Sequence, residues 1–311
     1  MVNGRRVRSR RRYQMIDNIK ICGSYERTER KAENRKECRM EKKISLTRLK
    51  TAPNSVTPEA KGKHLREVLR KQSLQSWCQL PHKGKGVCTY EECPKANCWI
   101  SSKKYLSSSE YINAIKMSCN VTAVRSVSGR TFSTTRCRHP GCSETETLGH
   151  LLGFCKTGEL LRNNRHHRAR TAIANLLRNR GWEVHEEIHC VSEDDSHRRV
   201  DIIVINRITQ KAMVLDPTIC FERDTNQALQ INDDKRGKYV PCLPYLSEKY
   251  GISLFNWDVT GLLFGARGCL PKFTCNILKS FQILFYEVQK IVMEILKASV
   301  QILHYHLYVN T

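Results

Sequence analysis

The sequence predicts an α/β protein with a mixed sheet flanked by helices, and three observations support this fold class. Two apolar runs, 200–206 and 211–216, are rich in β-branched residues and are joined by only four residues, as in a β-hairpin. Apolar residues recur at helical spacing in the segment before this hairpin. A further strand-like run at 251–259 follows a second helical segment, so helices and strands alternate along the chain.

The composition is that of a globular chain with an unusual charge. The 311 residues are 40% hydrophobic and 27% charged, but 53 Lys and Arg against 30 Asp and Glu give a net charge of +23. Such a charge favours polyanionic partners, either nucleic acid or an anionic membrane surface. No run of 18 uncharged apolar residues and no secretory signal is present, so we expect an intracellular protein without a membrane role. Its 15 cysteines then indicate metal ligands and reduced thiols.

The N-terminal region differs from the rest of the chain. Residues 1–50 hold 17 Lys and Arg against 6 Asp and Glu with little hydrophobic periodicity, which predicts a disordered basic arm over 1–55. A solubilising tail and a nucleic-acid-binding arm explain it equally well. The following segment predicts short helices around 64–75 and 109–117. Equally spaced cysteines with an upstream histidine leave a second zinc site open there, although the spacing fits no common pattern: Cys88, Cys93, Cys98 and His82.

A zinc knuckle is predicted between positions 137 and 155, in "CRHPGCSETETLGHLLGFC". Four residues of ligand type lie within this short stretch: Cys137, Cys142, His150 and Cys155. Pro and Gly between the first two cysteines suit a tight loop, and "SETE" at 143–146 predicts a capping box that starts a short helix. A unit this small has no core of its own, so structural zinc explains the four ligands better than packing does.

The segment 160–181, "LLRNNRHHRARTAIANLLRNRG", predicts a helix whose apolar residues lie on one face. It carries arginines and no acid, whereas solvated helix faces normally mix both signs. We therefore expect it to contact the phosphates of DNA or RNA through Arg162, Arg165, Arg168 and Arg170.

Each strand of the hairpin contains one aspartate. If Asn206 pairs with Lys211, then Asp201 lies directly opposite Asp216, where two like charges are destabilising unless a cation lies between them. Carboxylate oxygens are the ligands that Mg²⁺ takes, so this register predicts a site for metal-assisted phosphodiester hydrolysis. The alternative is that the aspartates are exposed at strand ends, since Asp216 precedes a proline.

The next segment, "DTNQALQINDDKRGKY", predicts a helix that begins at an Asp224 cap and ends before Pro241. Lys235, Lys238 and Tyr239 fall within one turn near its end. A lysine beside two metal-binding acids stabilises developing negative charge or orients an attacking water. A solvated helix end, with lysines that complement the dipole, is the competing explanation.

In this order, the residues resemble the C-terminal part of the polyprotein of site-specific non-LTR retrotransposons (LINE elements). There a CCHC knuckle precedes a restriction-like endonuclease of the PD-(D/E)xK superfamily. The resemblance covers roughly 60–311 and includes "NCWI" at 97–100, "TTRCRHPGC" at 134–142, "ETLGHLLGFC" at 146–155, the two aspartates and the "KRGKY" at 235–239. Two positions depart from the family: Val200 replaces the proline before the first acid, and Thr218 replaces the superfamily's lysine. The second departure fits a lysine supplied from the helix instead.

The resemblance implies a restriction-endonuclease-like sheet preceded by the knuckle and the basic arm, with no polymerase, as in a truncated polyprotein. The expected segments are a basic arm (1–55), a linker or thumb-like remnant (56–135), a CCHC knuckle (136–156), a restriction-like endonuclease with a leading basic helix (157–275) and a C-terminal amphipathic helix (276–311).

The activity that the resemblance implies is a metal-dependent DNA endonuclease, which nicks target DNA to prime reverse transcription. Its catalytic residues would be Asp201, Asp216, Lys235, Lys238 and Tyr239, with Mg²⁺ or Mn²⁺ on the two aspartates and structural Zn²⁺ in the knuckle. The partners would be double-stranded DNA and the element RNA, and the location nuclear. Two alternatives remain: a non-catalytic nucleic-acid-binding relic, and a zinc-dependent adaptor, which the charge disfavours. Glu222 is expected near the site, with its role open.

Overall fold

The computed structural model describes residues 58–102, 105–127 and 134–309, and the chain divides into two units, 1–81 and 82–311. The described part of the first unit contains helix α4 (Pro58–Cys78), which extends further in both directions than the helix expected at 64–75. The basic arm expected at 1–55 lies outside the described residues.

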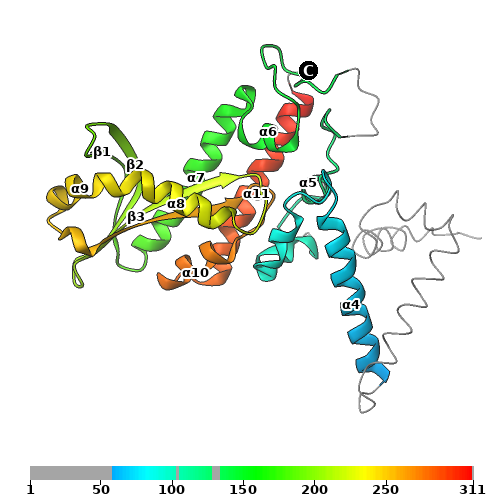
Figure 1. Cartoon of the computed structure of the whole chain (residues 1–311), viewed down its shortest axis with the longest axis horizontal. Helices are drawn as coiled ribbons and strands as arrows, with labels where there is room; N and C mark the ends of the chain where they lie inside the picture. The colour runs from blue at the N-terminus through cyan, green and yellow to red at the C-terminus, as the bar shows by residue number, and fades with distance from the viewer. Residues whose placement is uncertain (1–57, 103–104, 128–133, 310–311) are drawn as a thin grey trace, which may run out of the picture. The chain divides into compact units, whose positions relative to one another are not determined.

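The second unit is built on a four-stranded mixed sheet in the order β1-β2-β3-β4 (Figure 1). The three neighbours β1, β2 and β3 are antiparallel, whereas β4 runs parallel to β3. A parallel neighbour needs a long crossover, which helices α8 (Gln227–Tyr239) and α9 (Leu243–Tyr250) provide. The strands are β1 (Glu183–Val191), β2 (His197–Asn206), β3 (Lys211–Cys220) and β4 (Trp257–Gly265). The predicted mixed α/β class is therefore confirmed.

The hairpin between β2 and β3 has the predicted register. Asn206 pairs with Lys211, and the ladder continues to the pair of Ile202 with Leu215. The side chain of Asn206 accepts hydrogen bonds from two backbone N–H groups of the turn, at 3.0 Å each, and so fixes where the strands reverse. The ladder stops one step before the predicted pair of acids, so Asp201 on β2 and Asp216 on β3 follow its last pair and are not themselves paired in it.

Helices cover both faces of this sheet. Side chains alternate along a strand, so Ile202 and Leu215 pack toward helices α7, α10 and α11, whereas Ile203 and Val214 pack toward helices α8 and α9. In Figure 1, α7 and α11 lie side by side behind the sheet and α8 crosses in front of it. The helices are α7 (Glu159–Arg178), α8 (Gln227–Tyr239), α9 (Leu243–Tyr250), α10 (Lys272–Ser280) and α11 (Phe285–Tyr308). The acids on the strands thus lie between two helical layers.

The C-terminal segment, expected as one amphipathic helix over 276–311, forms the end of α10 and the whole of α11. Helix α11 is a core element, because its buried residues extend from Val288 to Leu307 and contribute to two apolar clusters. One cluster is shared with the sheet and α7, and the other with the knuckle helix α6 (Leu148–Gly153) and with α5 (Ser108–Ser118). Among the described residues, no helix combines the length and apolarity needed to cross a membrane.

A buried ion pair fastens the segment before the knuckle to the sheet. Arg267, with none of its surface exposed, donates from Nε to Glu222 Oε2 at 2.8 Å. Burial lowers the pKa of Arg267, but the negative charge of Glu222 outweighs this effect, so the pKa is raised. The same guanidinium donates to Asn120 Oδ1 at 2.8 Å and to the Lys85 carbonyl at 3.1 Å. Glu222 therefore serves this ion pair.

Residues from 82 onward, expected as part of a linker over 56–135, pack into the second unit.

Three predicted boundaries are wrong for local reasons. The "SETE" box does not start α6, because the Thr147 hydroxyl caps that helix by accepting the His150 N–H at 2.9 Å. Asp224 does not cap α8, since it accepts the Asn226 N–H at 2.9 Å in a turn that precedes the helix. The strand predicted from 251 begins only at Trp257, after a 3₁₀ turn.

Candidate functional site

The four predicted zinc ligands converge on one point. Their ligand atoms all lie within 4.8 Å of one another, with Cys137 and Cys155 buried. The Sγ atoms of these two cysteines are 3.9 Å apart, and Cys142 Sγ is 3.5 Å from His150 Nε2. Zn–S bonds of about 2.3 Å in a tetrahedral site place two sulfurs about 3.7 Å apart. The donor set and its spacing therefore fit a structural zinc ion held by three thiolates and one imidazole.

The predicted zinc ligands have neighbours that the spacing of the motif does not indicate. His306, from α11, has its Nε2 3.8 Å from Cys137 Sγ and 3.3 Å from Glu146 Oε2. Glu146 is fully buried and also accepts from Arg138 at 2.7 and 2.9 Å. Outer partners of this kind orient metal ligands, so the end of α11 is tied to the knuckle. His139 is not a member of the ligand group and contacts the His306 carbonyl at 3.1 Å.

The arginines of α7 do not form the open basic face that the sequence predicted. Arg165 is buried, donates to Ser299 and to the Leu152 carbonyl at 2.8 and 2.9 Å, and has its pKa lowered to about 10 by burial. Arg170 is also buried and pairs with Glu186 and Glu187. Arg162 donates to the Cys155 carbonyl, and the more exposed Arg168 pairs with Glu294. The acids and carbonyl or hydroxyl groups that satisfy these arginines lie outside α7, so the pattern of one helix does not reveal them.

Asp216 is the buried centre of the acidic site. Only 2% of its surface is exposed, and each carboxylate oxygen has a partner from α8. Lys235 Nζ lies 2.8 Å from Oδ1, and the Tyr239 hydroxyl donates to Oδ2 at 2.9 Å. A buried carboxylate without such partners is strongly unfavourable. A cation was expected beside the two acids, and in the structure the ammonium group of Lys235 provides one.

Asp201 lies next to the same group and meets a histidine from α7. His166 Nε2 is 3.2 Å from Asp201 Oδ2 and 2.8 Å from the Pro217 carbonyl oxygen. Burial would raise the pKa of Asp201, but the contact with His166 and the charges of His166 and Lys235 outweigh it, so the pKa is lowered. The contact with Asp201 in turn raises the pKa of His166. His166 was missed because only the tertiary fold brings α7 to these strands.

The predicted residues at the end of α8 have distinct positions. Lys238 Nζ donates to the Tyr239 hydroxyl at 2.9 Å and lies 4.6 Å from its ring centre, so it reaches Asp216 only through that hydroxyl. The hydroxyl is also 3.0 Å from the Arg199 carbonyl. Burial, followed by the charge of Asp216, raises the pKa of Tyr239 far above its ordinary value. Tyr239 is thus a hydrogen-bond donor to Asp216.

A glycine opposite the acid lets α8 approach the sheet. Gly261 pairs with Asp216 across β3 and β4, and its N–H donates to Asn232 Oδ1 at 3.2 Å. A Cβ atom at this position would lie 2.9 Å from Lys235 Cγ and 3.0 Å from the Ile231 carbonyl oxygen. The absence of a side chain therefore permits the contact between Lys235 and Asp216.

The donor chemistry of the two aspartates suits a hard divalent ion, but the protein's own groups already neutralise them. Asp201 and Asp216 are acids on adjacent strands, and carboxylate oxygens are preferred by Mg²⁺. Within the described part of the chain, however, no close group of three or more Cys, His, Asp or Glu includes either residue. A divalent ion would thus take its remaining oxygens from water and phosphate, and would replace Lys235 on Asp216.

The second zinc site left open by the sequence is not assembled in the described ranges, where no metal-binding group contains its four residues. Cys93 Sγ lies 3.9 Å from Cys275 Sγ, and Cys98 Sγ is 2.6 Å from Gln289 Nε2. These thiols thus face different elements of the core, which explains why their regular spacing has no metal-binding consequence.

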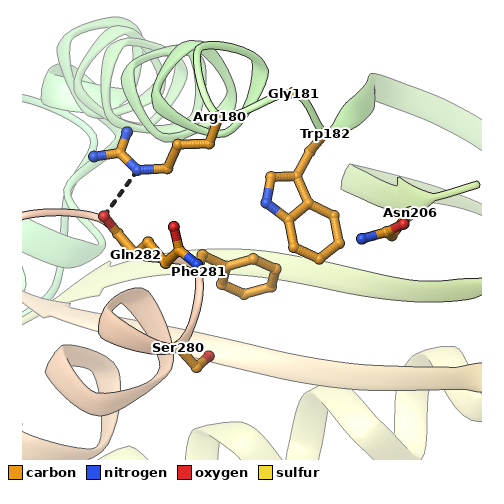
Figure 2. A pocket seen from close by; sticks show the side chains of 7 residues that line it. All are labelled: Arg180, Gly181, Trp182, Asn206, Ser280, Phe281 and Gln282. Carbon is orange, nitrogen blue, oxygen red and sulfur yellow. Dashed lines mark hydrogen bonds between the residues drawn. The ribbon is translucent and has the colours of Figure 1, made fainter. Parts of the chain in front are cut away.

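A shallow pocket lies away from the acids, at the hairpin end of the sheet. Figure 2 shows Arg180 and Trp182 on one side and the 280–282 turn on the other, with Arg180 Nε donating to the Gln282 carbonyl at 2.9 Å. Its volume of about 180 Å³ is below the range of roughly 300–1,000 Å³ typical of ligand sites. The acidic site between the two helical layers is accordingly the stronger candidate for chemistry.

Comparison with known proteins agrees with the resemblance of the motifs. No protein-family model matches the chain. Two proteins of Popillia japonica, each described as a retrovirus-related Pol polyprotein from type-1 retrotransposable element R2, are similar to it. One is 28% identical over 174 residues, 55% of this chain and 35% of that protein. The other is 29% identical over 150 residues, 46% of this chain and 23% of that protein.

The matches therefore span about a third or less of the relatives' own length. Within that span, the sequence similarity supports a protein derived from a non-LTR retrotransposon and related to its Pol polyprotein.

Proposed function

We propose that the second unit is a restriction-like, divalent-metal-dependent DNA endonuclease of a non-LTR retrotransposon, which nicks target DNA to prime reverse transcription. The single observation that carries this proposal is the convergence on Asp216. Asp201 and Asp216 directly follow the last pair of the β2–β3 ladder, Ile202 with Leu215, and Lys235 Nζ lies 2.8 Å from the Asp216 carboxylate. Two acids on a mixed sheet, with a lysine from the helix that packs on it, suit metal-assisted phosphodiester hydrolysis.

The roles follow from the contacts. Asp201 and Asp216 would hold Mg²⁺ or Mn²⁺, which when bound polarises the scissile phosphate and lowers the pKa of an attacking water. Lys235, once released from Asp216, would place its ammonium against the phosphate and stabilise the charge that develops there. Tyr239 keeps Asp216 oriented through its 2.9 Å hydrogen bond, and Lys238 supports that hydroxyl. Zinc held by the knuckle would act structurally.

Double-stranded DNA as the substrate, element RNA as a further partner and a nuclear location are parts of the same proposal. The net charge of +23 supports a polyanionic partner. Because Arg165 and Arg170 are buried and paired, the phosphate contacts must come largely from other cations. Arg168, which is half-exposed, remains a candidate if DNA competes with Glu294.

The test is cleavage of supercoiled plasmid by the purified chain in Mg²⁺. Wild type should convert the plasmid to the nicked form, whereas Asp216→Asn, which keeps the shape of the side chain, should not. Asp258→Asn is the matched control, since Asp258 lies on β4, is half-exposed and pairs with Arg236 outside the site. Equal nicking by wild type and Asp216→Asn would refute the assignment.

A second candidate is a nucleic-acid-binding protein without turnover. The observation that favours it is that Lys235, Tyr239 and His166 satisfy both aspartates without any metal. On this alternative, wild type and Asp216→Asn bind duplex DNA equally and neither nicks it, which a gel-shift assay beside the nicking assay resolves.

A further inference from the structure

The two aspartates lie where strands β2 and β3 stop pairing with each other, a point that we call the fork of the sheet. The ladder between β2 and β3 ends at the pair of Ile202 with Leu215, one residue before the acids. Beyond that point β2 stays paired with β1, through Val200 and Ile188, and β3 stays paired with β4, through Pro217 and Leu262. The separation between Asp201 and Asp216 is therefore not set by hydrogen bonds between their own strands.

Two side chains from opposite helical layers span this fork. Tyr239, on α8, contacts the Arg199 carbonyl of β2 and the Asp216 carboxylate of β3. His166, on α7, contacts Asp201 of β2 and the Pro217 carbonyl of β3 through the same nitrogen, at 3.2 and 2.8 Å. Both neighbours of that nitrogen are acceptors, so Nε2 carries a hydrogen and the histidine acts as a donor to both strands.

We propose that His166 is a positioning residue of this site, whose Nε2–H holds Asp201 and the Pro217 carbonyl at the fork and so fixes the spacing of the two acids for a divalent cation. This inference rests on the proposed function. It deepens it by adding a residue outside the predicted set of acids, lysines and tyrosine. Hydrogen-bonded supports of metal-binding carboxylates characteristically change metal affinity when they are lost.

His166 differs from the adjacent His167 in its exposure to solvent and in the residues that it contacts. The His166 side chain is 31% exposed and Asp201 is 20% exposed, so the contact is largely removed from solvent. The adjacent His167 is 49% exposed and lies 3.6 Å from Glu187, away from both acids. His167→Ala is consequently a matched control of the same residue type, one position along the same helix.

The experiment measures binding of Mn²⁺ to the full chain, from the electron paramagnetic resonance signal of the free ion, together with plasmid nicking in Mg²⁺. The variants are His166→Phe, which keeps a ring but has no donor, His166→Gln, which restores an N–H donor, and His167→Ala. Thermal melting and zinc content report on folding. We expect His166→Phe to bind Mn²⁺ about 10–100-fold more weakly, His166→Gln to recover part of the affinity, and His167→Ala to match wild type.

The outcomes separate the two proposals. Wild-type Mn²⁺ affinity in His166→Phe, or equal losses in the Phe and Gln variants, overturns the role of His166. Absence of Mn²⁺ binding at the acids of wild type, judged against Asp216→Asn, overturns it as well. Mn²⁺ binding without nicking refutes the endonuclease alone, and the affinities of the variants still decide the role of His166. If His166→Phe does not fold, His166→Ala, which removes the ring without adding bulk, takes its place with the same expectations.

Discussion

Lys235 Nζ lies 2.8 Å from Asp216 Oδ1, although the lysine belongs to a helix and the aspartate to the neighbouring strand layer. Asp216 is nearly inaccessible, so this contact compensates a buried charge, and in the proposed function it also keeps a cation close to the acids. Gly261 on β4 makes the close approach of the two layers possible. The predictions below follow from this relationship and from the knuckle.

Gly261→Ala should destabilise the fold and displace Lys235. The added methyl group meets Lys235 Cγ at 2.9 Å and a backbone carbonyl at 3.0 Å, so α8 must move away from the sheet. Overpacking of this kind costs about 1–3 kcal/mol, which urea unfolding measures. Gly237→Ala, on α8 with open space around the added atom, is the control and should keep or raise the stability. Equal stability of the two variants would contradict the packing argument.

The two lysines should differ in importance. Lys235→Ala removes the direct partner of Asp216 and should reduce the single-turnover nicking rate by about 10²–10³-fold, as loss of a transition-state donor does. Lys238→Ala acts through the Tyr239 hydroxyl, 2.9 Å away, and should reduce the rate less. Rates are compared at equal folded fraction by circular dichroism, because Lys235→Ala also leaves a buried carboxylate unpaired. A larger effect at Lys238 would reverse the assignment.

Tyr239 should remain protonated through neutral pH and act only as a donor. Burial and the charge of Asp216 raise its pKa above the ordinary value of 10.0. Its contribution to stability is therefore fully present below about pH 10, the value in the unfolded chain, and is lost as the pH rises toward the folded value. Without added divalent metal, phenolate absorbance of folded wild type and Tyr239→Phe should rise equally to about pH 11. An extra phenol that ionises in wild type below that pH would disprove this role.

Zinc should be held by the knuckle and supported by α11. Cys142→Ser removes a ligand and should release about one zinc ion per chain. His306→Gln leaves the four ligands in place but alters the contacts to Cys137 and Glu146, so chelator competition should show about 10–100-fold weaker binding. Cys88→Ser, outside the ligand group, is the control. Unchanged zinc content in Cys142→Ser would remove the zinc site.

Local patterns predicted the parts of the structure that depend on neighbours in the chain. The turn of four residues between β2 and β3, with Asn206 at its start, determined the pairing as far as Ile202 with Leu215, and the two aspartates follow that last pair. The spacing of cysteines and histidine in the knuckle similarly anticipated the cluster of ligand atoms. Both features are formed by residues that lie close together in the sequence, so they can be predicted without knowledge of the tertiary fold.

Contacts between distant elements were not predictable from the same patterns. Arg165 and Arg170 had been expected to meet phosphates, but α7 packs between the sheet and α11, so their partners come from those elements. His166 reaches Asp201 only because α7 lies over β2 and β3. His306 supports the knuckle from the far end of the chain. A single sequence specifies these partners only through the complete fold.

The assignment of an endonuclease site at Asp201 and Asp216 depends on how plasmid nicking varies with Mg²⁺. Nicking is measured for wild type and for the double variant Asp201→Asn, Asp216→Asn, at protein concentrations where both bind DNA. We expect wild type to nick in Mg²⁺ and not in chelator, and the double variant to be inactive at every Mg²⁺ concentration. Nicking by the double variant at the wild-type rate, or DNA binding by wild type without Mg²⁺-dependent nicking, would contradict this assignment.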